Sequence, residues 1–177
     1  QGRFDEAESH LRDALRVSTA AGYRFDIALI LGFLGRNCAR AGRFSDGFLF
    51  LGTAREEFES TGCYGDVTRI DAWRAEALSL AGDAAAALAL ADATLSTVKG
   101  DRGVPPEVPL LERVRAEALW SLGDTEGAGR ALVASVDAAR SRGAEYELAL
   151  AIDVLERMPE LRTHFDDVEV LLAERDA

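Results

Sequence analysis

The sequence predicts an all-α fold built from about four two-helix repeats. Alanine is abundant, β-branched residues are few and only four prolines occur in 177 residues, a composition that favours helices. The glycines fall mostly at spaced positions, where they can end helices. A short motif also returns about every 40 residues, and a period of this length is typical of helical repeat proteins.

The motif opens as Gly2-Arg3-Phe4-Asp5-Glu6-Ala7 and returns at Gly42, Gly82 and Gly123, which gives spacings of 40, 40 and 41 residues. An apolar or small pair follows each motif, four and seven residues after its last position. These pairs are Leu11 and Ala14, Leu51 and Ala54, Ala91 and Thr94, and Leu132 and Ser135. The spacing places each pair on one helical face, so the same face occurs four times.

A second set of breaks lies half a period later, at Gly22, Gly62, Gly100 and Gly143, so each unit contains two helices. The expected helices span 4–21, 24–41, 44–61, 64–81, 83–98, 107–122, 125–142, 145–158 and 160–175. We expect one domain over 1–177, with a half repeat at 1–22 and repeats at 23–62, 63–99, 105–142 and 143–177. Ser45, Asp83 and Asp124 are expected at N-caps or first turns. A longer loop, with two adjacent prolines, is expected over 100–109.

The pattern small-x-aromatic-x-x-Ala in residues 2–7, with its apolar and small residues downstream, resembles the second half of the tetratricopeptide repeat. Gly35, Ala75 and Ala116, each seven before a repeat glycine, match the first half of that repeat. The 40-residue period is similar to the longer MalT-like variety. This resemblance implies a right-handed α-α superhelix, or solenoid, with a concave surface for partners.

Residues 109–115, 142–150 and 172–176 resemble the C-terminal repeat region of bacterial proteins that also carry a class III adenylate/guanylate cyclase domain and an ATPase domain. The resemblance implies a fragment of a larger signalling protein, acting as a non-catalytic protein-interaction and regulatory module. The alternative is a ligand- or peptide-sensing repeat domain of a MalT/LuxR-like transcription regulator. Such regulators end in a basic helix-turn-helix, and no basic recognition helix occurs in this sequence.

The tetratricopeptide geometry implies that positions thirteen, ten and six before each repeat glycine are exposed on the concave face. They are Leu29, Gly32, Arg36, Arg69, Ala72, Glu76, Leu110, Arg113 and Glu117. The expected partner contacts are Arg36, Arg40, Arg69, Glu76, Arg113, Glu117 and Trp120, because arginine, glutamate and tryptophan suit peptide recognition. On this reading Glu76→Leu changes stability by less than about 0.5 kcal/mol, whereas Ala75→Leu overpacks a helix contact at a cost of about 1–3 kcal/mol.

No catalytic, cofactor or metal site is expected, and the segment is expected not to be an enzyme. The sequence lacks a phosphate-binding loop and a nucleophile elbow. His10 and His164 lie far apart, and the acidic run 165–169 lacks the glycine and alternating acids of a calcium loop. We expect Cys38 in the core and Cys63 at a helix corner. Tyr23, Tyr64 and Tyr146 are expected to pack between adjacent helical hairpins.

The net charge of −11 disfavours nucleic acid and anionic membranes as partners, because both attract clustered basic residues. No apolar run approaches the roughly 18 residues of a membrane span. A cytoplasmic protein or peptide partner is expected, including upstream domains of the same polypeptide. Self-association through exposed terminal repeats is a further expectation.

Overall fold

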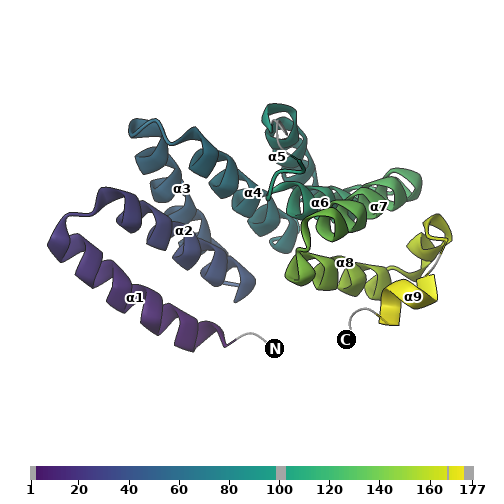
Figure 1. Ribbon diagram of the computed structural model, residues 1–177, viewed down its shortest axis with the longest axis horizontal. Coiled ribbons are helices and arrows are strands. Elements are labelled where there is room, and N and C mark those ends of the chain that lie inside the picture. Colours follow the sequence, from purple (N-terminus) through teal and green to yellow (C-terminus); the bar gives the residue numbers. More distant parts are fainter. Residues whose placement is uncertain (1–2, 99–102, 167, 174–177) are drawn as a thin grey trace. The chain divides into compact units, whose positions relative to one another are not determined.

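The computed structural model describes residues 3–98, 103–166 and 168–173, and all regular structure within these ranges is helical (Figure 1). This confirms the expected all-α class. The helices are α1 (Phe4–Ala21), α2 (Arg24–Arg40), α3 (Phe44–Ser60), α4 (Tyr64–Leu80), α5 (Ala84–Thr97), α6 (Val108–Ser121), α7 (Thr125–Arg142), α8 (Glu145–Arg157), the 3-10 helix η1 (Pro159–His164) and α9 (Val168–Ala173).

The last expected helix, 160–175, is not continuous. Pro159 starts the 3-10 helix η1, and Phe165 then adopts an extended backbone with φ −119° and ψ 129°, which ends it before α9 begins. Proline favours the start of a helical segment and prevents continuation of α8 through it. Several residues used in the sequence analysis lie outside the described part of the chain: Gly2, residues 99–102, Asp167 and residues 174–177.

Glycines of the motif and of the second set of breaks end the helices as the sequence predicts. Six of them, Gly22, Gly42, Gly62, Gly82, Gly123 and Gly143, have positive φ angles between 64° and 89°. This left-handed conformation reverses the chain after a helix and is adopted most readily by glycine. Asp124 caps α7 by accepting a hydrogen bond from the Gly127 amide at 2.8 Å. Ser45 lies in the first turn of α3 and Asp83 directly precedes α5, also as expected.

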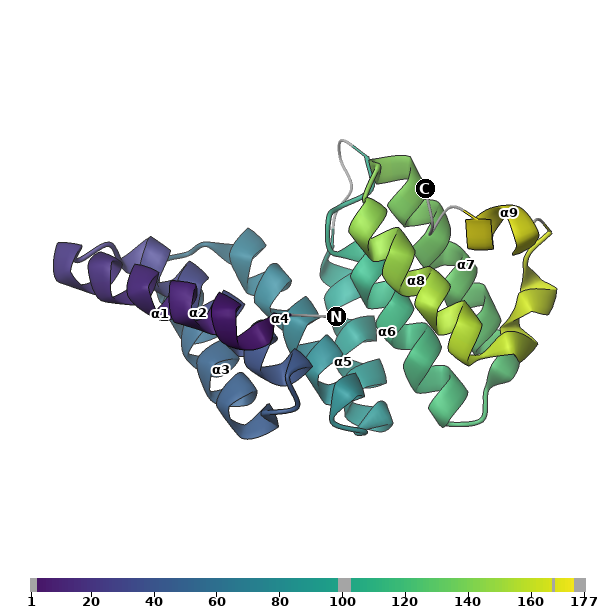
Figure 2. The same cartoon turned by 90° about the horizontal axis from the view of Figure 1, so that it is seen from below.

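The chain divides into two compact units, Gln1–Asp83 and Ala84–Ala177. In the first unit, α2 packs against α1 and α3, and α4 packs against α3 and α2. In the second, α6 packs against α5 and α7, while α8 lies along α7 and α6 (Figure 2). Helices that are adjacent in sequence therefore pair in both units.

The core of the first unit forms where α2 approaches α3 most closely. A Cβ atom on Gly35 would lie 2.6 Å from Leu51 Cγ and 2.9 Å from the Gly47 carbonyl oxygen. Only a hydrogen atom fits at this position, so the two helix backbones come into direct contact. Phe58 extends the core, with its ring edge-on to Phe25 at a centroid distance of 5.4 Å.

The core of the second unit joins α6, α7, α8, η1 and α9. Leu132, Ile152, Leu155 and Leu161 are all at most 1% exposed and belong to one cluster. The buried Ser135 hydroxyl of α7 donates a hydrogen bond to the Pro109 carbonyl of α6 at 2.7 Å. This bond satisfies a polar group that would otherwise be costly to bury.

A salt bridge connects α1 to the start of α3. Glu8 of α1 accepts hydrogen bonds from Arg43 and from Arg12, one helical turn away. The bond from Arg43 and the bond from Arg12 hold the pKa of the Glu8 carboxyl below its ordinary value of 4.5.

We expect this pair to make stability depend on pH. Because the pKa of Glu8 is lower in the folded chain, its contribution is fully present at pH 7 and is lost as the pH falls below 4.5 through the folded-state pKa. Urea denaturation of the parent and Glu8→Gln should therefore differ at pH 7, and the difference should shrink on acidification. A difference that stays constant down to pH 3 would contradict the assignment.

Candidate partner-binding surface

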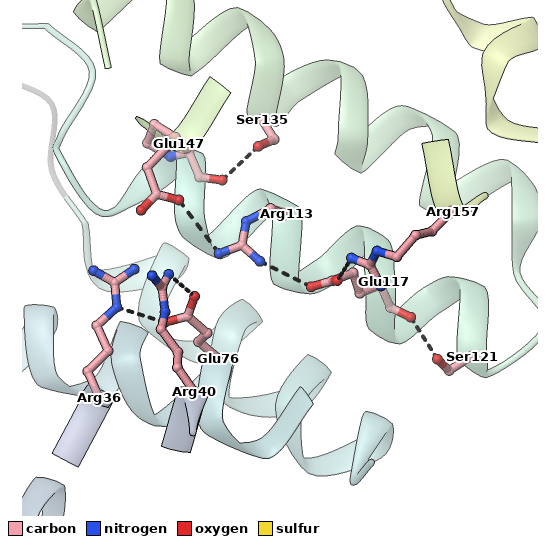
Figure 3. Close-up of polar contacts among 10 residues, drawn as sticks. Arg36, Arg40, Glu76, Arg113, Glu117, Ser121, Ser135, Glu147 and Arg157 are labelled. Carbon is pink, nitrogen blue, oxygen red and sulfur yellow. Dashed lines mark hydrogen bonds and ion pairs between the residues drawn. The ribbon is translucent and has the colours of Figure 1, made fainter. Parts of the chain in front are cut away.

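In the first unit, two arginines of α2 converge on one buried carboxylate of α4 (Figure 3). Arg36 Nε lies 2.8 Å from Glu76 Oε2, and Arg40 Nη2 lies 2.6 Å from Glu76 Oε1. The Glu76 side chain is 5% exposed and each arginine side chain 19% exposed. The two arginines are four residues apart, so both reach the same neighbouring helix from one face of α2.

An aromatic pair lies beside this ion cluster. The Arg36 guanidinium carbon is 5.4 Å from the centroid of the Trp73 ring, within cation–π range. The Phe33 ring lies 5.1 Å from the Trp73 ring at an angle of 40°. Trp73 is buried, whereas Phe33 is 42% exposed. We call Phe33, Arg36 and Trp73 the aromatic patch.

The second unit contains a comparable ion cluster between α6 and α8 (Figure 3). Arg113 lies 3.2 Å from Glu117 and 3.6 Å from Glu147, and Arg157 lies 2.6 Å from Glu117. The Arg113 side chain is only 7% exposed. The Glu117 carboxylate thus pairs with Arg113 of its own helix and with Arg157 of α8. These ion pairs connect α6 to α8.

Nine positions of α2, α4 and α6, which we call the stripe, are expected from the sequence to be exposed on a concave face. This expectation is wrong. Gly32, Ala72, Glu76, Leu110 and Arg113 are buried, and Leu29, Arg36, Arg69 and Glu117 are partly buried. The stripe is buried because α2 packs against α4, and α6 against α8, within their units. A Cβ on Gly32, for example, would lie 2.6 Å from Ile70 Cδ1 and 3.0 Å from Trp73.

The expectation about Glu76 changes accordingly. Glu76 is a buried ion-pair partner, so the small stability effect expected for Glu76→Leu is corrected to a large one. Ala75 has no exposed surface, in agreement with a packed position. Arg69 pairs with Asp66 on its own helix at 2.8 Å, and Trp120 is partly buried against the core of the second unit.

The expected packing of the tyrosines between hairpins is also wrong. Tyr23, Tyr64 and Tyr146 are 61%, 69% and 57% exposed, respectively. Tyr23 is the N-cap of α2, Tyr64 the first residue of α4 and Tyr146 the second residue of α8, so all three lie where a helix starts. Cys38 is buried as expected, and burial raises the pKa of its thiol; Cys63 is partly exposed.

A shallow pocket of about 250 Å³ in the second unit has charged walls of both signs. Glu112 and Arg115 of α6 face it, together with Asp124 and Arg130. Arg115 also bonds Asp92 of α5 at 2.6 Å and Glu112 at 2.7 Å. Burial lowers the pKa of the Arg115 guanidinium, but the two carboxylates raise it by more, so the net shift of this pKa is upward. The charged groups of the pocket therefore already have partners: Arg115 pairs with Glu112, and Arg130 pairs with Glu126 at 2.9 Å.

Groups of three or more histidine, cysteine, aspartate or glutamate side chains that could hold a metal ion do not occur within 3–98, 103–166 and 168–173. Among the helices of the described chain, none is both long enough and apolar enough to cross a membrane. Neither a protein-family model, nor a curated protein, nor a solved structure matches the sequence or its fold. What the structure shows is that the described part of the chain is all-helical.

Phe33 and Trp73 were missed as candidate contacts by sequence reasoning, although a signal was present. Phe33 lies nine positions before Gly42, and Trp73 lies nine positions before Gly82. The two residues therefore occupy the same position in consecutive repeats. Two large aromatic residues one period apart predict a ring contact between the first helices of consecutive repeats, here α2 and α4. Which of the rings faces solvent depends on side-chain packing, and the sequence does not specify it.

Proposed function

We propose that this chain is a non-catalytic helical-repeat module that binds a protein or peptide partner as part of a larger bacterial signalling protein of the cyclase/ATPase type. The observation that carries the proposal is the aromatic patch, in which exposed Phe33 rests on buried Trp73 beside Arg36. Aromatic and arginine side chains dominate the binding energy of protein interfaces, especially where they are held in place before binding.

The packing around the patch supports this role. Trp73 is fixed by the α2–α4 contact, and Arg36 is fixed by its bond to Glu76. A partner that covers Phe33 would therefore bury an apolar ring without first ordering the residues beneath it. The TPR-like superhelix remains part of the proposal, supported by the 40-residue sequence period and by helices that pair with their sequence neighbours.

The parent-protein assignment rests on sequence resemblance alone. Under the alternative, a MalT/LuxR-like regulator, the module would sense a small ligand or peptide instead of docking to a protein. In either case a cytoplasmic location is proposed, because the two cysteines are too few and too far apart for a disulfide framework. A partner other than nucleic acid or membrane is proposed on the grounds of the net charge of −11.

Replacing Phe33 with alanine should weaken partner binding by roughly 10-fold or more, because a central aromatic contact is typically worth about 2 kcal/mol. The partner is first identified by cross-linking the chain in cells of its source organism, and its affinity is then measured by calorimetry with purified components. Leu49→Ala is the matched control, since Leu49 is 65% exposed but lies on α3, away from the patch residues of α2 and α4. The proposed surface would be contradicted if both variants lost the same affinity for the partner, or if Phe33→Ala lost none.

A further inference from the structure

Helix α1 exposes a face that its sequence equivalents bury. Ala7 and Ala14 are exposed and Leu11 is only partly buried. One period later, Gly47, Leu51 and Ala54 of α3 are all buried. Three periods later, Ala128, Leu132 and Ser135 of α7 are buried with no exposed surface. The residue types are nearly the same, so the difference lies in what covers them.

In each unit, the buried face is covered by the helix that comes directly before it in the sequence: α2 covers α3, and α6 covers α7. Helix α2 covers α3 with Gly35, whose Cα is so close that a Cβ would meet Leu51 and Gly47 at less than 3 Å. Helix α6 covers α7, with Ala116 in the same core cluster as Ala128 and Leu132. Each covering helix thus contributes a small residue to the contact, Gly35 at the closest approach of α2 to α3 and Ala116 within the shared cluster of α6 and α7.

The sequence ahead of α1 carries the same junction. Gly2-Arg3-Phe4 repeats Gly42-Arg43-Phe44, and the second of these motifs connects α2 to α3. Helix α2 packs against α1, where Asn37 donates a hydrogen bond to the Phe4 carbonyl at 3.0 Å, but it leaves Ala7 and Ala14 exposed.

We propose that the face formed by Ala7, Leu11 and Ala14 is a docking surface for an α-helix of the same kind as α2 and α6, joined directly ahead of the Gly2-Arg3-Phe4 motif. This helix would run antiparallel to α1 and place a glycine or alanine against Ala7 and Leu11, as Ala116 does in the core of the second unit. The surface uses only α1 and is independent of the aromatic patch.

The test is to supply such a helix. A copy of residues 107–122, which contain α6, is fused directly ahead of Gly2, because α6 already covers an alanine and a leucine in the same register as Ala7 and Leu11. Docking should add helical signal in circular dichroism. It should also raise the thermal midpoint by roughly 4 °C or more, since each kcal/mol shifts the midpoint of a chain of this size by about 2–4 °C.

Two variants control for unspecific effects of the added segment. Ala116→Glu in the added copy alone puts a charge at the tight contact and should abolish the rise. Ala14→Glu changes an exposed residue of the same face, so it should leave the unextended chain nearly unchanged but remove the gain from the extended one. The proposal is overturned if the extension gives no rise, or if the rise survives either substitution.

Sedimentation of the same proteins tests a second copy of the chain as the occupant. Under the proposal, the extended chain is a monomer whether or not the unextended chain pairs through α1. A dimer that Ala14→Glu dissociates but that the added helix does not displace would assign the face to a second copy instead, and would overturn the proposal.

Discussion

Replacing Glu76 with leucine should destabilise the chain by about 3 kcal/mol, because removing one member of a buried ion cluster leaves the other charges without compensation. Arg36 and Arg40 both bond this carboxylate, at 2.8 and 2.6 Å. Each arginine keeps 19% of its side chain exposed, and this residual hydration places the expected cost at the lower end of the range for buried pairs. Urea denaturation followed by circular dichroism gives the difference directly.

The matched control is Glu57→Leu. Glu57 also bonds an arginine, Arg24, at 2.6 Å, but the two side chains are 38% and 64% exposed. Exposed pairs contribute only about 0–1 kcal/mol, so this variant should remain close to the parent. Joint replacement of Arg36, Arg40 and Glu76 by methionine should restore much of the loss, since no unpaired charge then remains. Equal midpoints for Glu76→Leu and the parent would refute the structural role of the cluster.

The helix boundaries could be predicted because their determinants are local. Left-handed glycines such as Gly42 and Gly143 end helices through their own backbone preference, and the 40-residue period makes each ending reinforce the others. The break inside the final expected helix was not predictable in the same way. Pro159 marks its start, but no residue near Phe165 has a strong preference for ending a helix.

The burial of the charged stripe could not be predicted from helical periodicity alone. Periodicity assigns residues such as Glu76 and Arg113 to a common face, but it does not say which helix lies opposite. One sequence signal was informative: Arg36 and Glu76 lie 40 residues apart, as do Glu117 and Arg157, and both pairs form salt bridges. Opposite charges one period apart indicate ion pairs between the first helices of consecutive repeats. In both pairs the glutamate is the more buried partner, at 5% exposure for Glu76 and 14% for Glu117.

Replacing Gly35 with alanine should destabilise the chain, although alanine normally favours a helix over glycine. The new Cβ would lie 2.6 Å from Leu51 Cγ and 2.9 Å from both the Gly47 oxygen and the Leu51 nitrogen. Two of these three atoms belong to the backbone, so α2 and α3 must separate to admit the methyl group. Overpacking of this kind costs about 1–3 kcal/mol, and it outweighs the roughly 1 kcal/mol that alanine gains in helix propensity.

Gly52→Ala isolates the propensity effect from the packing effect. Gly52 lies in the middle of α3, on the helix that Gly35 contacts, and a Cβ there would meet no atom within 4 Å. This variant should therefore be more stable than the parent by about 0.5–1 kcal/mol. Urea denaturation of the two variants should give shifts of opposite sign. If both substitutions stabilise the chain, the α2–α3 contact is looser than the structure describes, and the close glycine approach would not be what fixes the spacing of these two helices.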